Sequence, residues 1–213
     1  MECRNENLLL YAVTDREWTG RQSLLEQVEC ALKGGATCVQ LREKELDESA
    51  FLEEAIQMKQ LCARDGVPFI VNDNVEIAIQ CGADGVHVGQ TDMEAGHVRQ
   101  MVGDKMMIGV SARTVEEALA AQAAGADYLG VGAMFSTSTK LDAHVLGYQT
   151  LKDICAAVDI PVTAIGGINE ENMMRLSGSG VDGVALVSAI FAAADIEAAC
   201  RRLKAMSEAM VAG

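Results

Sequence analysis

The strongest constraint on the fold is a unit that recurs along the chain: a short apolar run, a polar or glycine-bearing loop, and then an amphipathic helix. The eight runs are Leu8–Val13, Cys38–Leu41, Pro68–Val71, Gly85–Val88, Met106–Val110, Tyr128–Val131, Pro161–Ile165 and Gly183–Val187. Apolar residues recur at helical spacing between them, for example in Ser23–Lys33, Ser49–Arg64, Val115–Ala124 and Asn172–Leu176. Strands that alternate with helices on short connections are predicted to be parallel, with right-handed crossovers.

A second repeat favours a closed sheet. A glycine, a small apolar residue and a polar residue precede the second, fourth, sixth and eighth runs, as Gly35-Ala36-Thr37, Gly82-Ala83-Asp84, Gly125-Ala126-Asp127 and Gly180-Val181-Asp182. Glycine suits the left-handed conformation that ends a helix. An open doubly wound sheet is the alternative, but a repeat on the even strands favours an α/β fold of one domain, a (β/α)8 TIM barrel over residues 1–213.

The composition of the chain excludes some classes of binding partner. The net charge of −14 argues against nucleic acid or an anionic membrane surface. Apolar runs stay well short of the roughly 20 residues of a membrane span, so no membrane partner is expected. The seven cysteines are scattered without a Cys-x-x-Cys pair, which predicts reduced thiols in a cytoplasmic protein.

Three alternating side chains follow the second run. Gln40, Arg42 and Lys44 share one side of an extended segment, where an amide, a guanidinium and an ammonium group would face one ligand. Guanidinium and ammonium groups are common partners of phosphate oxygens. The alternative is a solvated strand end paired with Glu43 and Glu45, and the spacing alone favours neither.

Two aspartates follow adjacent runs. Asp73 comes after the third run, and Asp92 lies in the loop after the fourth. Two carboxylates together with phosphate oxygens and water suit octahedral Mg²⁺. Asp73 could instead cap a helix and Asp92 form a turn. Because neighbouring strands of a barrel end at the same rim, the pair favours a metal site.

The fifth and sixth runs end in hydroxyl groups. Ser111 could bind phosphate or cap the helix that begins near Thr114. The segment Ser136–Lys140 combines hydroxyl side chains with a lysine, and it could bind an anion or form a surface loop.

The last two runs end in the most specific positional signal. Gly166-Gly167 follows the seventh run and Ser188 the eighth, where barrels of this class commonly bind phosphate with a short extra helix. Tight turns without a ligand are the alternative. His87, inside the fourth run, is interpreted as a core histidine with satisfied hydrogen bonds rather than a catalytic one.

In this order, the segments resemble the thiamine phosphate synthase family over nearly the whole chain. The matching segments are Tyr11–Arg16, Val39–Lys44, Val71–Asp73, Gly85–Gln90 with Asp92, Gly109–Ser111, Thr137–Lys140, Ile165–Ile168 and Val187–Ile190. Each alone is weak, but all of them in order are highly specific. Ala133 and Ser136 depart from the family pattern, which usually has prolines at these positions.

The resemblance implies a reaction between two phosphorylated small molecules: hydroxymethylpyrimidine diphosphate and hydroxyethylthiazole phosphate give thiamine phosphate and diphosphate. The family mechanism is dissociative, because diphosphate leaves before the thiazole nitrogen captures the pyrimidine carbocation. The pyrimidine diphosphate would be held by Gln40, Arg42, Lys44, Asn72, Ser111 and Lys140. Of these, the cations Arg42, Lys44 and Lys140 are expected to act in catalysis.

The family pattern also assigns the other ligands. Asp73 and Asp92 would bind Mg²⁺. The thiazole phosphate would be held by Thr137, Thr139, Gly167, Val187 and Ser188, with Ser138 in the same loop. The alternatives are a thiazole tautomerase-like isomerase, a phosphate-binding barrel enzyme of amino-acid synthesis, and a non-catalytic ligand-binding barrel. The sequence leaves the oligomeric state open, a homodimer included.

Overall fold

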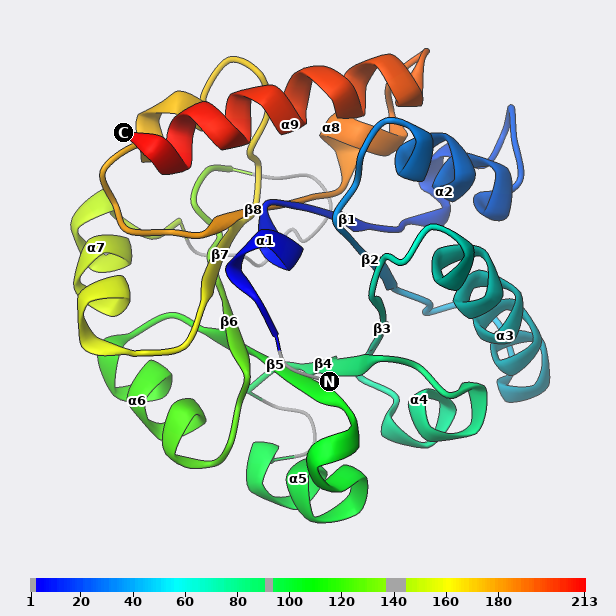
Figure 1. Cartoon of the computed structure of the whole chain (residues 1–213), viewed down its shortest axis with the longest axis horizontal. Helices are drawn as coiled ribbons and strands as arrows, with labels where there is room; N and C mark the ends of the chain where they lie inside the picture. Colours follow the sequence, from blue (N-terminus) through cyan, green and yellow to red (C-terminus); the bar gives the residue numbers. More distant parts are fainter. Residues whose placement is uncertain (1–2, 91–93, 137–144) are drawn as a thin grey trace.

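The structure, a computed structural model, describes residues 3–90, 94–136 and 145–213 and contains a closed barrel of parallel strands (Figure 1). Each strand pairs with the next in chain order, and β8 pairs with β1. The strands are β1 Leu10–Val13, β2 Cys38–Leu41, β3 Phe69–Asn72, β4 Gly85–Val88, β5 Met107–Ala112, β6 Tyr128–Val131, β7 Val162–Ile165 and β8 Gly183–Leu186. The (β/α)8 prediction is therefore confirmed.

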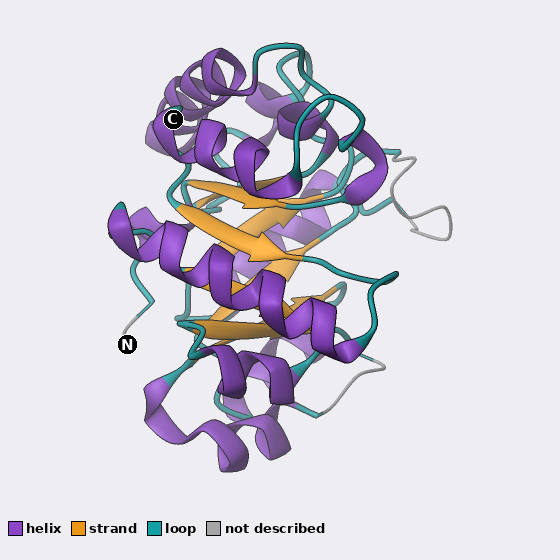
Figure 2. Ribbon diagram, turned by 90° about the vertical axis from the view of Figure 1, so that its right-hand side faces the viewer, coloured by secondary structure: helices purple, strands orange, loops and turns teal. Residues whose placement is uncertain are grey.

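Helices surround the barrel, and Figure 2 shows the strands running toward one end of the molecule, away from the N-terminus. The α-helices are α1 Asn5–Leu8, α2 Leu24–Lys33, α3 Glu48–Arg64, α4 Val75–Cys81, α5 Ala95–Val102, α6 Val115–Ala123, α7 Tyr148–Ala157, α8 Ser188–Phe191 and α9 Ile196–Ala212. The 3₁₀ turns are η1 Arg16–Trp18, η2 Gly103–Lys105 and η3 Met173–Leu176. Among the described residues, no helix is both long enough and apolar enough to cross a membrane.

Two predicted segments differ from the structure. Leu8 does not belong to the first strand, because it ends α1 and packs among the side chains inside the barrel. The segment Asn172–Leu176 contains the 3₁₀ turn η3 rather than an α-helix, because its N–H groups donate to carbonyls three residues earlier, as from Arg175 to Asn172.

The repeat before the even strands has a structural role. Asp84, Asp127 and Asp182 each accept a hydrogen bond from the backbone N–H of the preceding odd strand, at 2.9, 2.7 and 2.8 Å. Thr37 does the same for the N–H of Leu10 at 2.8 Å. These side chains tie neighbouring strands at the amino end of the barrel. The glycines that begin the four repeats all have positive φ, as the helix-ending pattern predicts.

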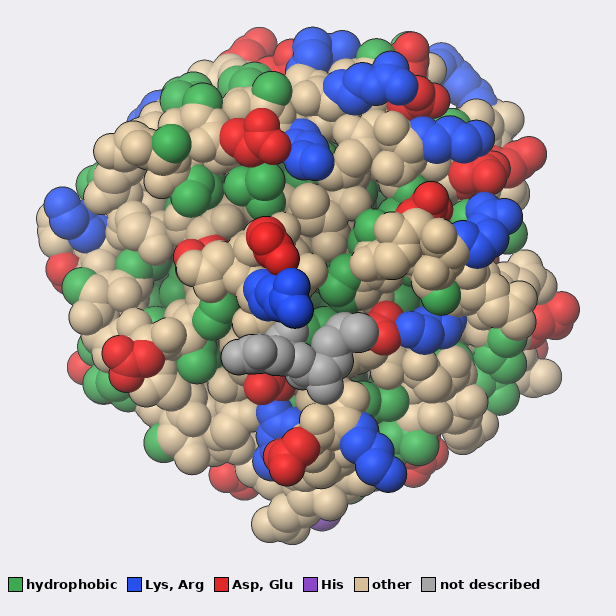
Figure 3. Space-filling model, in the orientation of Figure 1, with side chains coloured by type: hydrophobic (Ala, Val, Ile, Leu, Met, Phe, Trp, Pro, Cys, Tyr) green, Lys and Arg blue, Asp and Glu red, His purple; other side chains and the backbone are tan. Residues whose placement is uncertain are grey.

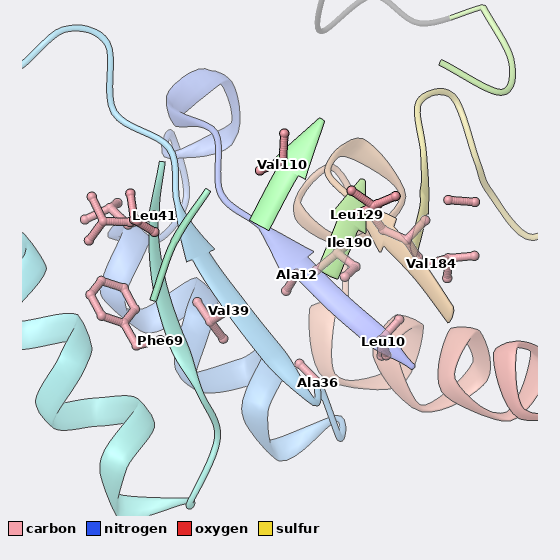
Figure 4. Packing of buried hydrophobic residues seen from close by; sticks show 14 of the residues in the cluster. Leu10, Ala12, Ala36, Val39, Leu41, Phe69, Val110, Leu129, Val184 and Ile190 are labelled. Carbon is pink, nitrogen blue, oxygen red and sulfur yellow. The ribbon is translucent and has the colours of Figure 1, made fainter. Parts of the chain in front are cut away.

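The core has two layers. The larger lies between the strands and the helices, and Figure 4 shows part of it around Leu10, Val39 and Phe69. The smaller fills the inside of the barrel with side chains that alternate with the outer ones: Leu8, Tyr11, Val13, Cys38, Ile70, Met107, Tyr128 and Ala185. Figure 3 shows acidic and basic side chains interspersed over the face that carries α1, opposite the carboxyl ends of the strands.

Candidate active site at the carboxyl ends of the strands

A pocket of about 400 Å³ lies at the carboxyl ends of the strands. Strand alternation points side chains into it from β1 to β8, so residues far apart in sequence share one wall. The sequence-predicted site residues that line it are Gln40, Arg42, Asn72, Ser111, Gly167, Val187 and Ser188. The structure therefore brings the expected ligands of both substrates to one pocket.

Arg42 and Lys44, the cations after β2, both form salt bridges with aspartates. Arg42 pairs with Asp15 at 3.1 Å, and Lys44 Nζ lies 2.6 Å from Asp73 Oδ2. Neither pairs with Glu43 or Glu45 as the solvated-strand alternative supposed. Lys44 and Asp73 do not line the pocket, but Asp73 directly follows the lining residue Asn72, and Lys44 lies two residues beyond the lining residue Arg42, which places the pair at the rim.

Glu43 fixes the shape of the loop that carries Lys44. Its side chain is 1% exposed. One carboxylate oxygen accepts hydrogen bonds from the backbone N–H groups of Lys44, Glu45 and Leu46 at 2.7, 2.5 and 3.0 Å. The other accepts from Arg16, which also pairs with Glu54. Burial raises the pKa of the Glu43 carboxyl, but the N–H groups and Arg16 outweigh it and leave the pKa below 4.5.

Asp73 has an unusual backbone conformation at the rim of the pocket. Among the described residues it is the one non-glycine with positive φ, at 61°, a conformation that costs about 1–3 kcal/mol. Its N–H donates to the carbonyl of His87 at 2.8 Å. The helix-cap alternative is wrong for Asp73, because Asn74 caps α4.

A carboxylate at the rim fits Mg²⁺ shared with a diphosphate, because such ions use one or two carboxylates together with phosphate oxygens and water. Asp73 is the described member of the predicted pair. Groups of three or more possible protein ligands are absent from the part of the chain that the structure describes. Asp92, the second predicted metal ligand, lies outside that part.

A chain of hydrogen-bonding groups lies at and below the floor of the pocket. Gln40 Nε2 donates to the Tyr11 hydroxyl at 2.6 Å, and this hydroxyl shares a 2.8 Å hydrogen bond with that of Tyr128. The Tyr128 hydroxyl lies 3.2 Å from His87 Nδ1, and His87 Nε2 lies 3.0 Å from Ser111 Oγ. Burial raises the pKa of Tyr11 and of Tyr128 well above 10.0, so both hydroxyls stay protonated.

His87 has the satisfied ring nitrogens that were predicted, but it is half-buried rather than a core residue. Its ring nitrogens have partners, as a core histidine requires, yet the ring also lines the pocket. Gly109 makes room for this arrangement, since a Cβ there would lie 2.2 Å from the Tyr128 ring and 2.4 Å from His87. The alternative role of Ser111 as a helix cap is wrong, because Thr114 caps α6.

The opposite wall is a glycine turn after β7. Gly166 and Gly167 have φ of 98° and 66°. A Cβ on Gly167 would lie 2.4 Å from the carbonyl oxygen of Ser136, so the turn packs against the loop after β6. Ser188 begins α8, the short extra helix predicted after β8. Backbone N–H groups of such turns commonly approach a phosphate closely.

Some predicted ligands cannot be placed, and some lining residues were not predicted. Thr137, Ser138, Thr139 and Lys140 lie outside the described residues. The unpredicted lining residues include Tyr11, Gln90, Arg113 and Thr163. Alternation could have found Arg113, which is two residues beyond Ser111, and Tyr11, which is two before Val13.

A closed barrel with a polar, cation-bearing pocket at this end is the arrangement of a (β/α)8-barrel enzyme. The family model described as thiamine monophosphate synthase matches residues 10–190. The thiamine-phosphate synthase of Ruminiclostridium cellulolyticum is 48% identical over 91% of this chain and 92% of its own length, and that of Clostridium tetani is 45% identical over 95% and 97%.

A solved structure agrees with these relatives. The thiamine phosphate pyrophosphorylase of Pyrococcus furiosus superposes with a TM-score of 0.90 and 38% identity, covering 97% of this chain and 98% of that one. The (S)-3-O-geranylgeranylglyceryl phosphate synthase of Thermoplasma acidophilum, at 18% identity and a TM-score of 0.71, shares the fold. The chain belongs to the thiamine monophosphate synthase family.

Proposed function

We propose that this chain is a transferase of thiamine biosynthesis, a thiamine-phosphate synthase. It joins hydroxymethylpyrimidine diphosphate to hydroxyethylthiazole phosphate and releases thiamine phosphate and diphosphate. The observation that carries the proposal is a pocket with Arg42 at the end of β2, a glycine turn at the end of β7 and hydrogen-bonding side chains between them. Two phosphorylated heterocycles can meet in such a pocket. The close family relatives support the same reaction.

The diphosphate of the pyrimidine substrate lies on the β2–β3 side. Arg42 binds its oxygens while Asp15 holds the guanidinium in place, and Lys44 binds them from the rim. Asp73 and Asp92 would hold Mg²⁺, which would supply positive charge to the diphosphate. Gln40, Asn72 and Ser111 contribute neutral contacts. Lys140 is proposed as a third cation on the same leaving group.

The thiazole phosphate lies on the β7–β8 side, against Gly167, Val187 and Ser188, with Thr137, Ser138 and Thr139 as further ligands. Diphosphate leaves first, and the electron-rich aminopyrimidine stabilises the resulting carbocation. The neutral thiazole nitrogen then forms the new bond to carbon. No proton has to be removed from this nitrogen, so the step needs no general base.

The domain organisation and the cellular compartment of the enzyme are part of the proposal. We propose one catalytic domain over residues 1–213. The seven cysteines are all free thiols, three of them buried, which supports a reducing compartment and therefore the cytoplasm.

The test is formation of thiamine phosphate from both substrates with and without Mg²⁺, followed by mass spectrometry. We expect one diphosphate per thiamine phosphate, and only with the metal. Asp73→Asn should lower the rate roughly tenfold or more, whereas Asp153→Asn, on the exposed face of α7, should match the wild type. Isomerisation of the thiazole without condensation would instead support the tautomerase-like alternative.

A further inference from the structure

Thr163 is a buried hydroxyl residue that the functional assignment does not use. It lies on β7, is 1% exposed and lines the pocket. Its hydroxyl oxygen has no hydrogen-bond partner among the residues that the structure describes. Two other buried polar atoms share that property, Gln27 Oε1 and Ser179 Oγ, but neither residue lines the pocket.

An unpartnered buried hydroxyl opposes folding, because it loses its hydrogen bonds to water and gains none in return. Valine has nearly the same shape as threonine and would fill the same position on β7 without that cost. The hydroxyl of Thr163 therefore has no structural use that valine would not serve better. A ligand in the pocket is the partner that the position lacks.

The surroundings of Thr163 show where such a ligand group would lie. In the strand register Thr163 pairs with Gly130, and Gly130 pairs with Ser111. A Cβ on Gly130 would come within 3.0 Å of the His87 ring, so the absence of a side chain at this position makes room for the ring. Thr163 therefore lies across Gly130 from Ser111, and both residues line the pocket together with His87, so a ligand group between them would lie within reach of Thr163.

Charged and uncharged groups lie at different depths in the pocket, and this difference indicates which part of a substrate lies next to Thr163. The cations Arg42 and Lys44 follow the end of β2, and the glycine turn follows the end of β7, so charged phosphates bind at the mouth. Within the barrel, Gln40, Tyr11 and Thr163 are neutral. An uncharged ring with several hydrogen-bonding atoms matches that environment.

We propose that the Thr163 hydroxyl hydrogen-bonds the polar edge of the aminopyrimidine ring, and this inference rests on the proposed function. The aminopyrimidine has an amino group and ring nitrogens that take no part in bond formation. The thiazole has one ring nitrogen, and a hydroxyl that donated to it would occupy the lone pair that must attack. The pyrimidine is therefore the heterocycle that Thr163 binds.

The experiment compares three variants of the full-length enzyme. Thr163→Val removes the hydroxyl and keeps the shape, and Thr163→Ser keeps the hydroxyl. Ser179→Ala removes an unpartnered buried hydroxyl outside the pocket and is the matched control. We expect Thr163→Val to raise KM for the pyrimidine diphosphate roughly five- to tenfold and to leave KM for the thiazole phosphate unchanged. Thr163→Ser should recover most of the pyrimidine affinity that Thr163→Val loses, and Ser179→Ala should keep wild-type KM values.

Thermal unfolding separates a binding role from a structural one. Thr163→Val should melt at or above the wild-type temperature, because it removes an unsatisfied group. Wild-type KM for both substrates in Thr163→Val would overturn the inference while leaving the function intact. A change in KM for the thiazole phosphate alone would also overturn it and assign Thr163 to the other ring.

Binding of the pyrimidine can be measured even in a protein that does not catalyse the condensation. If the wild type forms no thiamine phosphate, calorimetric titration with free 4-amino-5-hydroxymethyl-2-methylpyrimidine tests Thr163 independently. Binding that is present in the wild type and in Ser179→Ala, but weakened in Thr163→Val, would support the inference. Equal binding by all three proteins, or binding by none, would overturn it.

Discussion

The hydroxyl of Tyr128 lies between two groups of the pocket, the Tyr11 hydroxyl and the ring of His87. Through them it links Gln40 on β2 to Ser111 on β5. Both of these residues are expected to contact the pyrimidine diphosphate. Tyr128 is itself 1% exposed and does not line the pocket, so it acts by positioning the others.

Tyr128→Phe should lower the free energy of unfolding by about 1–3 kcal/mol, because it removes a hydrogen bond from the buried hydroxyl of Tyr11 and another from the half-buried ring of His87. It should also lower kcat/KM, because His87 loses the hydrogen bond that fixes its ring, and Ser111 is in turn held by that ring. The control is Tyr148→Phe, whose hydroxyl is exposed and donates to the Ser177 carbonyl. Urea denaturation and steady-state kinetics on both variants make the comparison. Equal effects of the two substitutions would remove Tyr128 from the positioning network.

Glu43 predicts a dependence of stability on pH. The pKa of its carboxyl is below 4.5 in the folded protein, so the folded state binds a proton more weakly than the unfolded chain. The stabilisation is present at neutral pH and is lost as the pH falls through the folded pKa. Glu43→Gln should therefore cost about 1–3 kcal/mol near pH 7 and clearly less near pH 4. A difference between wild type and variant that stays constant with pH would contradict this.

The elements differ in how far the sequence could predict them. Every predicted strand overlaps an observed one and ends within two residues of it, because parallel strands buried on both faces read as continuous apolar runs. The pocket residues Gln40, Asn72 and Ser111 follow from the ends of those strands. The partner of Arg42 could not be predicted, since Asp15 lies 27 residues away and meets it only through β1–β2 pairing.

The turn formed by Gly166 and Gly167 after β7 predicts the effect of adding a side chain there. Gly167→Ala should unfold more easily and bind thiazole phosphate more weakly, because the new Cβ would collide with the carbonyl oxygens of Phe135 and Ser136. Gly66 has almost the same φ, 68° against 66°, but nothing within 4 Å of its Cβ position. Gly66→Ala therefore carries only the backbone strain of about 1–2 kcal/mol. Equal losses of stability and affinity in the two variants would show that the contact with the β6 loop is unimportant.

At the scale of the whole molecule, one end of the barrel holds the strands together and the other end carries the pocket. The amino end carries Thr37, Asp84, Asp127 and Asp182, which tie the strands together. The carboxyl end carries the pocket, with Arg42 in its lining and Lys44 at its rim, so two cations lie close to the ligands in a chain of net charge −14. Because the strands are fixed at one end, the loops at the other can be shaped for ligands at little cost to the fold.

Single-turnover kinetics with a fluorinated pyrimidine diphosphate decide whether this pocket drives departure of diphosphate before attack. An electron-withdrawing substituent destabilises the pyrimidine carbocation, whereas a direct displacement is much less sensitive to it. With enzyme in excess and chemistry shown to limit the rate, we predict that the rate constant falls by at least roughly tenfold relative to the normal substrate. Arg42→Gln should lower the same rate constant more than it weakens binding of thiazole phosphate. Near-equal rates for the two pyrimidines would contradict the dissociative route and leave Arg42 as a binding residue only.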